Sequence, residues 1–257
     1  MSSDVDQHDL RIERRGDATW LTIDRPQKRN ALTVSLVRSM AGAIEEAAAD
    51  GSRAVVVTGA PPAFCAGGDL PELSRVAEDG ALAATEVIYG AFHGLVRALV
   101  HSPLPTIAAV DGAAMGAGLD LAMACDLRVV TRRSTLASSW IGAGLVPGMG
   151  GAFMLPRLVG SARAAEMLLC GDPVDADRAA DWGLVNRVVA DDGLTAAVDE
   201  VVAKLTSRSA VGLARTKASF RRGVDAGLAA ELDTLGAVQG ALLTAPDFLQ
   251  VVERFRR

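Results

Sequence analysis

Aromatic residues, cysteine and histidine are scarce in this chain of 257 residues, and their scarcity excludes several classes of protein. Phe, Trp and Tyr make up only 4% of the sequence, so we do not expect aromatic rings that stack on nucleic-acid bases. The three cysteines, Cys65, Cys125 and Cys170, form no C-x-x-C pair, and the three histidines are dispersed. Because no metal-ligand spacing is present, we expect free thiols and no bound metal.

Long apolar runs and an excess of one charge are also lacking. No run of about 18 uncharged apolar residues occurs, so no membrane span is expected. Residues 1–15 are polar and charged, unlike a signal peptide, and a cytoplasmic protein is the simplest expectation. The formal net charge is −5 and the basic residues are scattered, so no nucleic-acid partner is expected.

The most informative stretch of the chain is residues 106–126. It begins with an apolar run of strand length, Thr106–Val110, and is then interrupted by Gly112, Gly116 and Gly118. A helical pattern follows from Leu119. The sequence therefore predicts a strand, a glycine turn and a helix whose first N–H groups lack partners within the helix.

Unpaired N–H groups at the positive end of a helix dipole favour a negatively charged ligand. Phosphate is a common ligand of such turns, but Gly116 and Gly118 lack the third glycine of the dinucleotide motif, and no P-loop is present. An oxygen that becomes negative during a reaction fits better. The alternative is a turn whose small residues only permit close packing, and this stretch alone leaves both interpretations open.

Another glycine turn lies earlier in the chain, and we call it the first glycine turn. Residues 54–58 are predicted to form a buried strand, and Gly67 and Gly68 follow in a turn that leads into a helix. Asp69 is well placed to cap that helix. Two such turns could each direct one N–H group at the same oxygen, as an oxyanion hole requires.

Hydrophobic periodicity predicts strands and helices along the whole chain. Strands are expected at residues 10–14, 19–24, 54–58, 106–110 and 127–131, and helices at 33–49, 72–101, 152–159, 162–170, 176–182, 194–205, 210–222, 226–243 and 247–255. The last part of the chain is nearly all helix, whereas the first part mixes strands and helices. We therefore predict a core at residues 1–195 and a helical capping or trimerisation region at 196–257.

Several motifs, in this order and spacing, resemble those of the crotonase superfamily, the enoyl-CoA hydratase/isomerase family. They include Phe64-Cys-Ala-Gly-Gly-Asp-Leu70, Gly116-Ala-Gly-Leu-Asp-Leu-Ala-Met-Ala-Cys-Asp126, Gly144-Leu-Val-Pro-Gly-Met-Gly-Gly151 and Ala180-Asp-Trp-Gly-Leu-Val-Asn-Arg-Val188. The resemblance implies an α/β fold, a crotonase-like spiral of ββα units followed by a helical C-terminal region. It further implies a homotrimer or dimer of trimers that takes acyl-CoA thioesters and needs no cofactor besides the coenzyme A of the substrate.

The resemblance also implies roles for particular residues. It places the two N–H donors of an oxyanion hole at Gly68 and Ala117, and an acid/base at Asp120. An alanine at position 117 is acceptable if its φ is negative, because only the N–H group is used. Contacts with the substrate or its coenzyme A are expected at Arg25, Arg29, Ala66 and Trp140. For the two arginines, ordinary surface charge is the alternative.

The sequence departs from the family where the chemistry depends on a second acid. Family hydratases use two glutamates, but here the first position holds the shorter Asp120 and the second holds Trp140, which cannot exchange a proton. Trp140 could instead line the acyl pocket and offer its N–H to an oxygen. Gly148 stands where aromatic dehalogenases and some isomerases carry an aspartate, and Glu72 is a remoter candidate acid.

Two functions therefore remain open at this stage. The first is a hydratase or isomerase that stabilises a thioester enolate and uses Asp120 as its acid/base. The second is a non-catalytic acyl-CoA-binding protein, in which Asp120 only stabilises the dipole of its helix.

Overall fold

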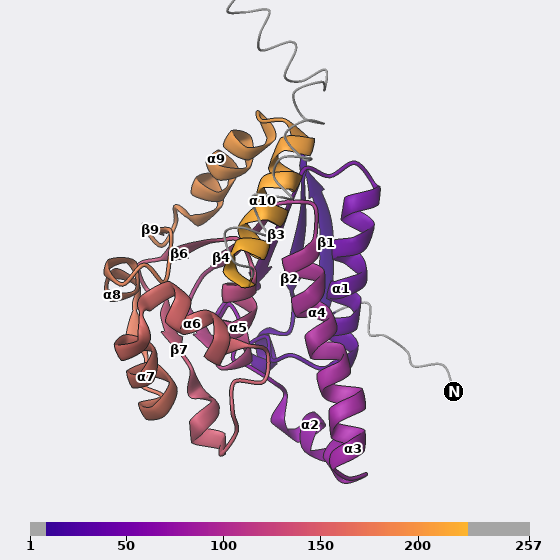
Figure 1. Cartoon of the computed structure of the whole chain (residues 1–257), viewed down its shortest axis with the longest axis vertical. Coiled ribbons are helices and arrows are strands. Elements are labelled where there is room, and N and C mark those ends of the chain that lie inside the picture. Colours follow the sequence, from indigo (N-terminus) through magenta and orange to yellow (C-terminus); the bar gives the residue numbers. More distant parts are fainter. Residues whose placement is uncertain (1–8, 226–257) are drawn as a thin grey trace, which may run out of the picture.

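The computed structural model describes residues 9–225, which form an α/β fold around a six-stranded sheet (Figure 1). The sheet order is β1-β2-β3-β4-β6-β9, and all neighbours are parallel except β1 and β2. Its strands are β1 (Leu10–Arg15), β2 (Ala18–Ile23), β3 (Ala54–Gly59), β4 (Thr106–Val110), β6 (Leu127–Thr131) and β9 (Arg187–Val189). A smaller sheet has the order β5 (Ala113–Met115), β7 (Thr135–Ala137) and β8 (Val174–Asp175).

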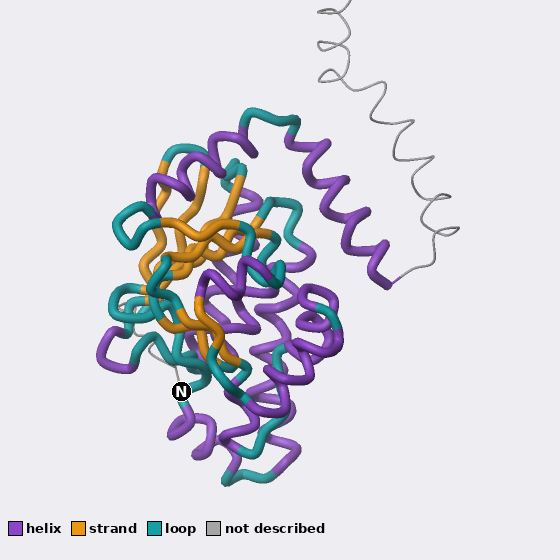
Figure 2. The backbone as a smooth tube through the Cα atoms, turned by 90° about the vertical axis from the view of Figure 1, so that its left-hand side faces the viewer, coloured by secondary structure: helices purple, strands orange, loops and turns teal. Residues whose placement is uncertain are grey.

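Helices cover both faces of the main sheet. The α-helices are α1 (Val34–Ala49), α2 (Leu70–Ala77), α3 (Ala81–Ala83), α4 (Gly90–His101), α5 (Ala117–Ala124), α6 (Gly151–Val159), α7 (Ser161–Cys170), α8 (Ala176–Asp181), α9 (Leu194–Thr206) and α10 (Ala210–Asp225). Shorter 3₁₀ and π segments are η1 (Pro26–Lys28), η2 (Ala84–Tyr89) and η3 (Ser139–Ala143). In Figure 2 the strands gather at one side of the body, and α10, which meets the grey trace, stands at its edge.

The central strands are buried on both faces, which explains their continuous apolar composition. Val55 and Val57 of β3 belong to the larger core, which includes residues of α1, α4 and α5. Val56 points the other way, into a second core that it shares with Val198 and Val201 of α9. Alternating side chains of one strand thus hold helices on opposite faces of the sheet.

Most of the predicted elements are present. The five predicted strands are confirmed, and Thr33 caps α1 by accepting the Leu36 N–H at 3.1 Å. The glycine-rich segment at residues 138–151 contains η3, and the short strands β5, β7, β8 and β9 were not predicted. Strands of two or three residues carry too few side chains for a pattern to be recognised.

Two predicted boundaries were wrong, and two predicted helices cannot be compared. α5 begins at Ala117 rather than Leu119, and the single helix expected at 72–101 is divided into α2, α3, η2 and α4. The division falls at Gly80, whose φ of 100° is not helical. The helices expected at 226–243 and 247–255 lie outside the described residues.

The predicted division of the chain at residues 195 and 196 falls within α9. Val198, Val201 and Val202 of that helix pack against strands of the main sheet. The region 196–257 as a cap or trimerisation element stays a prediction, and its residues 226–257 lie outside the described part.

The topology brings the two glycine turns together. β3 and β4 are adjacent and parallel, so the segments that leave their carboxyl ends emerge at the same edge of the sheet. Residues 60–68 follow β3, and residues 111–116 follow β4. They pair through Cys65, whose N–H donates to Ala113 O at 3.0 Å and whose O accepts the Met115 N–H at 2.9 Å.

Asn30 fixes the segment that carries the first glycine turn. It is fully buried, adopts a left-handed conformation with φ 59°, and accepts the Arg25 N–H at 2.9 Å. Its Nδ2 donates to Ala60 O at 2.7 Å and to Ala63 O at 2.6 Å. One side chain thereby satisfies three backbone groups around this segment.

We expect Asn30→Ala to lower the free energy of unfolding by about 3 kcal/mol or more, because it leaves buried backbone groups unpaired and puts alanine in a left-handed conformation. Urea unfolding measures this loss. Gln27→Ala, at an exposed position of η1, is the control and should change stability by less than about 0.5 kcal/mol. Equal stabilities of the two variants would contradict the role of Asn30.

Candidate active site

Gly68 and Ala117 each present a backbone N–H group that has no acceptor among the hydrogen bonds of the described residues. Ala117 is the first residue of α5, and Gly116 before it has φ 52° and offers no side-chain cap. Because Ala117 is helical, its φ is negative, which meets the condition that the sequence set for an alanine here. Gly68 lies directly after Gly67, whose φ is 109°.

The two turns lie in close contact. A Cβ atom at Gly118 would collide with Cys65 O, so only glycine allows α5 to approach the first turn this closely. A Cβ at Gly67 would lie 3.7 Å from Ala117 N and 3.1 Å from Met115 O. The small residues therefore do permit close packing, and the same packing brings the Gly67–Gly68 backbone next to the start of α5.

Asp120 lies in the first turn of α5 and is fully buried. Its Oδ2 accepts the Met149 N–H at 3.3 Å, and its carboxyl group lies against Gly151 at the start of α6. Oδ1 has no hydrogen-bond partner. Burial raises the pKa of Asp120 to about 7, partly opposed by the Met149 and Gly151 N–H groups and by the Trp140 indole.

Trp140, from η3, is buried beside Asp120. Its Nε1 meets the geometric criteria for a hydrogen bond with no described group. The indole N–H nevertheless lies close enough to Asp120 to lower the pKa of that carboxyl group. A Cβ at Gly116 would lie 3.8 Å from this Nε1 and 3.2 Å from Ser139 Oγ. The indole thus lies over Gly116, at the position where the resemblance leads one to expect a second acid.

Tyr89 and His93 close the site on the side of α4. Tyr89 ends the π-helical segment η2, and its ring lies over Gly148 so closely that any side chain at position 148 would collide with it. His93 Nε2 lies 2.9 Å from Gly148 O. Tyr89 therefore excludes an aspartate from position 148 in this arrangement.

The structure also locates the residues predicted to meet coenzyme A. Arg25 is largely buried and pairs with Asp69 at 3.2 Å and with Asp9 at 2.8 Å. Arg29 is exposed, and its backbone O accepts the Ala66 N–H at 2.9 Å, so these two residues are neighbours at the first glycine turn. Their contacts with a ligand stay predictions.

Two other acids near the first turn have structural partners. Asp69 caps α2, as predicted, by accepting the Glu72 N–H at 3.4 Å. Glu72 Oε1 accepts the Val34 N–H at 3.0 Å, at the start of α1. Glu72 is therefore engaged at a helix terminus and Asp69 at a cap, whereas Asp120 has no cation partner among the described residues.

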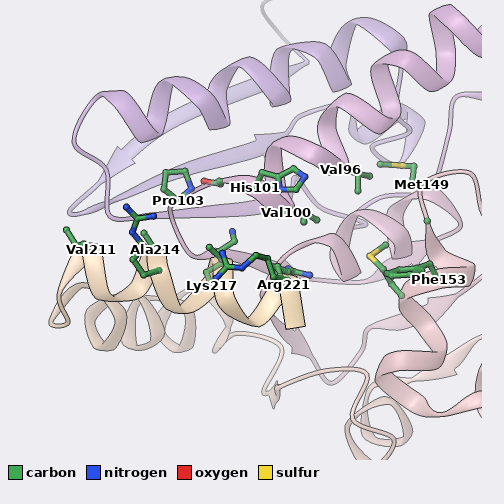
Figure 3. Close-up of a pocket in the computed structure, with 16 residues that line it drawn as sticks. Val96, Val100, His101, Pro103, Met149, Phe153, Val211, Ala214, Lys217 and Arg221 are labelled. Carbon is green, nitrogen blue, oxygen red and sulfur yellow. The ribbon is translucent and has the colours of Figure 1, made fainter. Parts of the chain in front are cut away.

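A cavity of about 800 Å³ lies between α4, α6 and α10 (Figure 3). Met149 lies on its wall and donates its N–H to Asp120 Oδ2. Lys217 Nζ on its wall donates to Leu99 O and Leu104 O, both at 2.9 Å, and pairs with Asp126 at 2.8 Å. Arg221 also pairs with Asp126 at 2.8 Å. These cations hold α10 to the core and already have acceptors.

The sequence reasoning missed this charged cluster around Asp126. An aspartate that ends a long apolar stretch is a signal of a buried partner, because an unpaired charge there would be costly. The partners of Asp126 are Lys217 and Arg221, about ninety residues further along the chain. No short sequence motif connects positions so far apart. Within residues 9–225 there is no group of His, Cys, Asp or Glu side chains suited to a metal, and no described helix is long and apolar enough to span a membrane.

Comparison with known proteins identifies the family. The model of the enoyl-CoA hydratase/isomerase family matches residues 14–254, and the chain belongs to this family. Over 214 residues it is 36% identical to the Bacillus subtilis protein YngF, whose name describes an enoyl-CoA hydratase/isomerase, covering 82% of this chain and 81% of that protein. The prediction of an acyl-CoA-processing enzyme is thereby confirmed.

Another relative is named for a different reaction, and a solved structure of an enoyl-CoA hydratase shares the fold. A 4-chlorobenzoyl coenzyme A dehalogenase of Arthrobacter is 34% identical over 80% of this chain and 75% of its own length. The crystal structure of an enoyl-CoA hydratase from Mycobacterium smegmatis superimposes with a TM-score of 0.89 at 32% identity, covering 96% of this chain and 95% of that chain. The predicted crotonase-like α/β fold is confirmed.

Replacing Asp120 by Asn should change how stability depends on pH. Because the folded pKa of about 7 lies above the ordinary 3.8, the wild type loses stability as pH rises from 3.8 to about 7 and is constant above that. Asp120→Asn has no carboxyl group to ionise at this position. Its free energy of unfolding therefore rises relative to that of the wild type over this pH range, by up to about 4 kcal/mol. Urea unfolding at several pH values measures the difference.

Asp111→Asn is the matched control for this measurement. Arg133 and Thr131 bond the Asp111 carboxylate and lower its pKa, so this acid stabilises the folded state above its ordinary pKa. Asp111→Asn should therefore lose stability relative to the wild type as pH rises, the opposite trend. A pH-independent difference between Asp120→Asn and wild type would show that the buried acid is not protonated at neutral pH.

We expect Gly118→Ala to separate the two glycine turns, because its Cβ has no room beside Cys65 O. The free energy of unfolding should fall by about 1–3 kcal/mol. Gly42→Ala in α1 is the control, since a Cβ there meets nothing within 4 Å, and it should be neutral or stabilising by up to about 1 kcal/mol. Similar unfolding curves for both variants would contradict the tight approach.

Proposed function

We propose that this enzyme binds an acyl-CoA thioester with the thioester oxygen between the N–H groups of Gly68 and Ala117, and that Asp120 moves the proton. The observation that carries this proposal is the contact between two glycine turns whose Gly68 and Ala117 N–H groups have no acceptor among the described residues, beside Asp120, a fully buried acid that no described cation pairs with. The N–H groups would stabilise the enolate oxygen, and each such donor typically lowers the barrier by about 3 kcal/mol.

One acid is sufficient for moving a double bond. Asp120 as a carboxylate would take a proton from Cα of a 3-enoyl thioester, forming a dienolate held by the two N–H groups. It would then return the proton to Cγ, which yields the 2-enoyl thioester. A pKa of about 7 suits this task, because acid and base forms are both populated near neutral pH. We therefore favour isomerisation over hydration, for which Trp140 cannot serve as the second acid/base.

The remaining predictions of the resemblance are part of the same proposal. Arg25, Arg29 and Ala66 adjoin the first glycine turn and are proposed to contact the coenzyme A portion, with exposed Arg29 the best placed for a phosphate. No cofactor beyond the coenzyme A of the substrate is proposed. We further propose a cytoplasmic homotrimer or dimer of trimers, with residues 196–257 as its capping or trimerisation region.

A second candidate is acyl-CoA binding without catalysis. It is favoured by one observation: Asp120 Oδ2 already accepts the Met149 N–H, so the carboxyl group stabilises the start of α6. Dehalogenation, the reaction in the name of the Arthrobacter relative, is not proposed, because position 148 holds glycine under the ring of Tyr89.

Deuterium exchange tests the proposal directly. Incubated in D₂O with 3-enoyl-CoA and 2-enoyl-CoA, the wild type should incorporate deuterium at Cα or Cγ, and mass spectrometry measures it. Asp120→Asn should reduce exchange by about a thousandfold or more while acyl-CoA affinity stays nearly unchanged, since only the proton carrier is lost. Asp177→Asn, at an exposed site on α8, should exchange like the wild type.

Each result decides between the two candidates. Tight acyl-CoA binding without exchange by the wild type would favour the binding protein. Unchanged exchange by Asp120→Asn would remove Asp120 from the mechanism.

A further inference from the structure

Arg25 binds both of the segments that meet at the first glycine turn. Its Nη1 and Nη2 each donate to Asp69 Oδ2 at 3.2 Å, and Nη1 also donates to Ala31 O. The ion pair is nearly buried, because the side chains of Arg25 and Asp69 are only 12% and 9% exposed. One planar guanidinium group thus joins residue 31 to the residue that directly follows Gly68.

The hydrogen bonds on either side of Gly68 determine which way its N–H group points. Leu32 donates its N–H to Gly67 O and accepts the Asp69 N–H, both at 2.8 Å, in the pattern of parallel strands. In that pattern, neighbouring residues direct their backbone groups to opposite sides, so the Gly68 N–H points away from Leu32. On the opposite side of the same segment, Cys65 pairs with β5, which leads into α5.

We propose that Arg25 is a positioning residue for the oxyanion hole, an inference that rests on the proposed function. Acting through Asp69, it fixes the direction of the Gly68 N–H group and its distance from the second donor. The two glycines of the turn have no side chains to hold them, and their backbone is the most flexible of any residue type. A buried ion pair adds little net stability, because desolvation offsets its attraction, and its contribution here is a fixed geometry.

This role differs from the contact with coenzyme A that was proposed above for Arg25. A contact with coenzyme A adds affinity for every acyl-CoA and leaves the reaction of the bound substrate unchanged. A positioning residue has the opposite signature, because an oxyanion donor acts mainly on the transition state and a misplacement of about 1 Å can cost about a hundredfold in rate. Affinity and rate measurements therefore separate the two roles.

Asp69→Asn tests the positioning role, because asparagine also caps a helix but carries no charge to pair with Arg25. Deuterium exchange into the bound substrate should fall at least about tenfold, while calorimetry gives a Kd for butyryl-CoA within about twofold of wild type. Asp175→Asn is the matched control. Asp175 also caps a helix, α8, by accepting the Arg178 N–H at 2.7 Å, and its variant should exchange like the wild type.

A double variant keeps the test independent of folding defects. Arg25→Met alone would leave the Asp69 carboxylate buried without its cation, which can prevent folding. Arg25→Met combined with Asp69→Asn removes both charges of the pair. We expect its exchange rate and its Kd for butyryl-CoA to equal those of Asp69→Asn within about twofold, because the guanidinium group has nothing to act through once the carboxylate is gone.

Ligand-free crystal structures of the wild type and Asp69→Asn measure the geometry without any substrate. The distance between the Gly68 and Ala117 nitrogens should differ by more than about 0.5 Å, the tolerance of a preorganised site. With [1-¹³C]butyryl-CoA bound, the infrared band of the thioester carbonyl should lie closer to its solution frequency in the variant, because a misplaced donor polarises the carbonyl less.

The inference is overturned if Asp69→Asn keeps both the wild-type nitrogen–nitrogen distance and the wild-type exchange rate. It is also overturned if either variant loses affinity for butyryl-CoA while its bound substrate exchanges at the wild-type rate. A failure of the proposed function is a different result, namely that the wild type neither shifts the carbonyl band nor exchanges deuterium. The ligand-free crystal structures then still decide whether Arg25 and Asp69 fix the position of Gly68.

Discussion

The candidate site depends on the contact between two glycine turns that follow adjacent parallel strands. Their approach is fixed by the pairing of Cys65 with Ala113 and Met115, and it is possible only because Gly118 has no side chain to meet Cys65 O. Close packing and a reactive backbone are often treated as competing explanations for glycine turns. In this protein the two explanations are compatible, because the closely packed turns also leave the Gly68 and Ala117 N–H groups without acceptors among residues 9–225.

Burial of Asp120 is the second constraint, and it follows from the same packing. α5 is buried along its whole length, so an acid in its first turn has no access to bulk water. The Met149 and Gly151 N–H groups and the indole of Trp140 recover part of the lost solvation of Asp120, but no cation within residues 9–225 pairs with it. The result is an acid whose pKa is close to neutrality. The stability lost as pH rises toward that pKa is the cost of keeping an ionisable acid inside the core.

Much of this arrangement could be predicted from the sequence, because its signals are local. Thr33 and Asp69 cap the helices that follow them, and the glycines mark both turns as expected. What could not be predicted depends on distant contacts. The start of α5 at Ala117, the role of Asn30 in fixing residues 60–63, and the place of Trp140 over Gly116 are all set by segments far apart in the chain. No periodicity reports such contacts, and only the resemblance to a family pointed to position 140.

Trp140 stands where the family resemblance leads one to expect a second acid, and this difference has an electrostatic consequence. Two buried carboxylates side by side repel each other, so one would hold a proton and the other would be charged. An indole N–H replaces that mutual repulsion with a donor that favours the charged form of Asp120. With one acid in place of two, proton transfer in the proposed reaction would depend on a single group that both accepts and returns the proton. An oxyanion hole with one acid is suited to reactions in which one carboxylate takes a proton from one carbon and returns it to another.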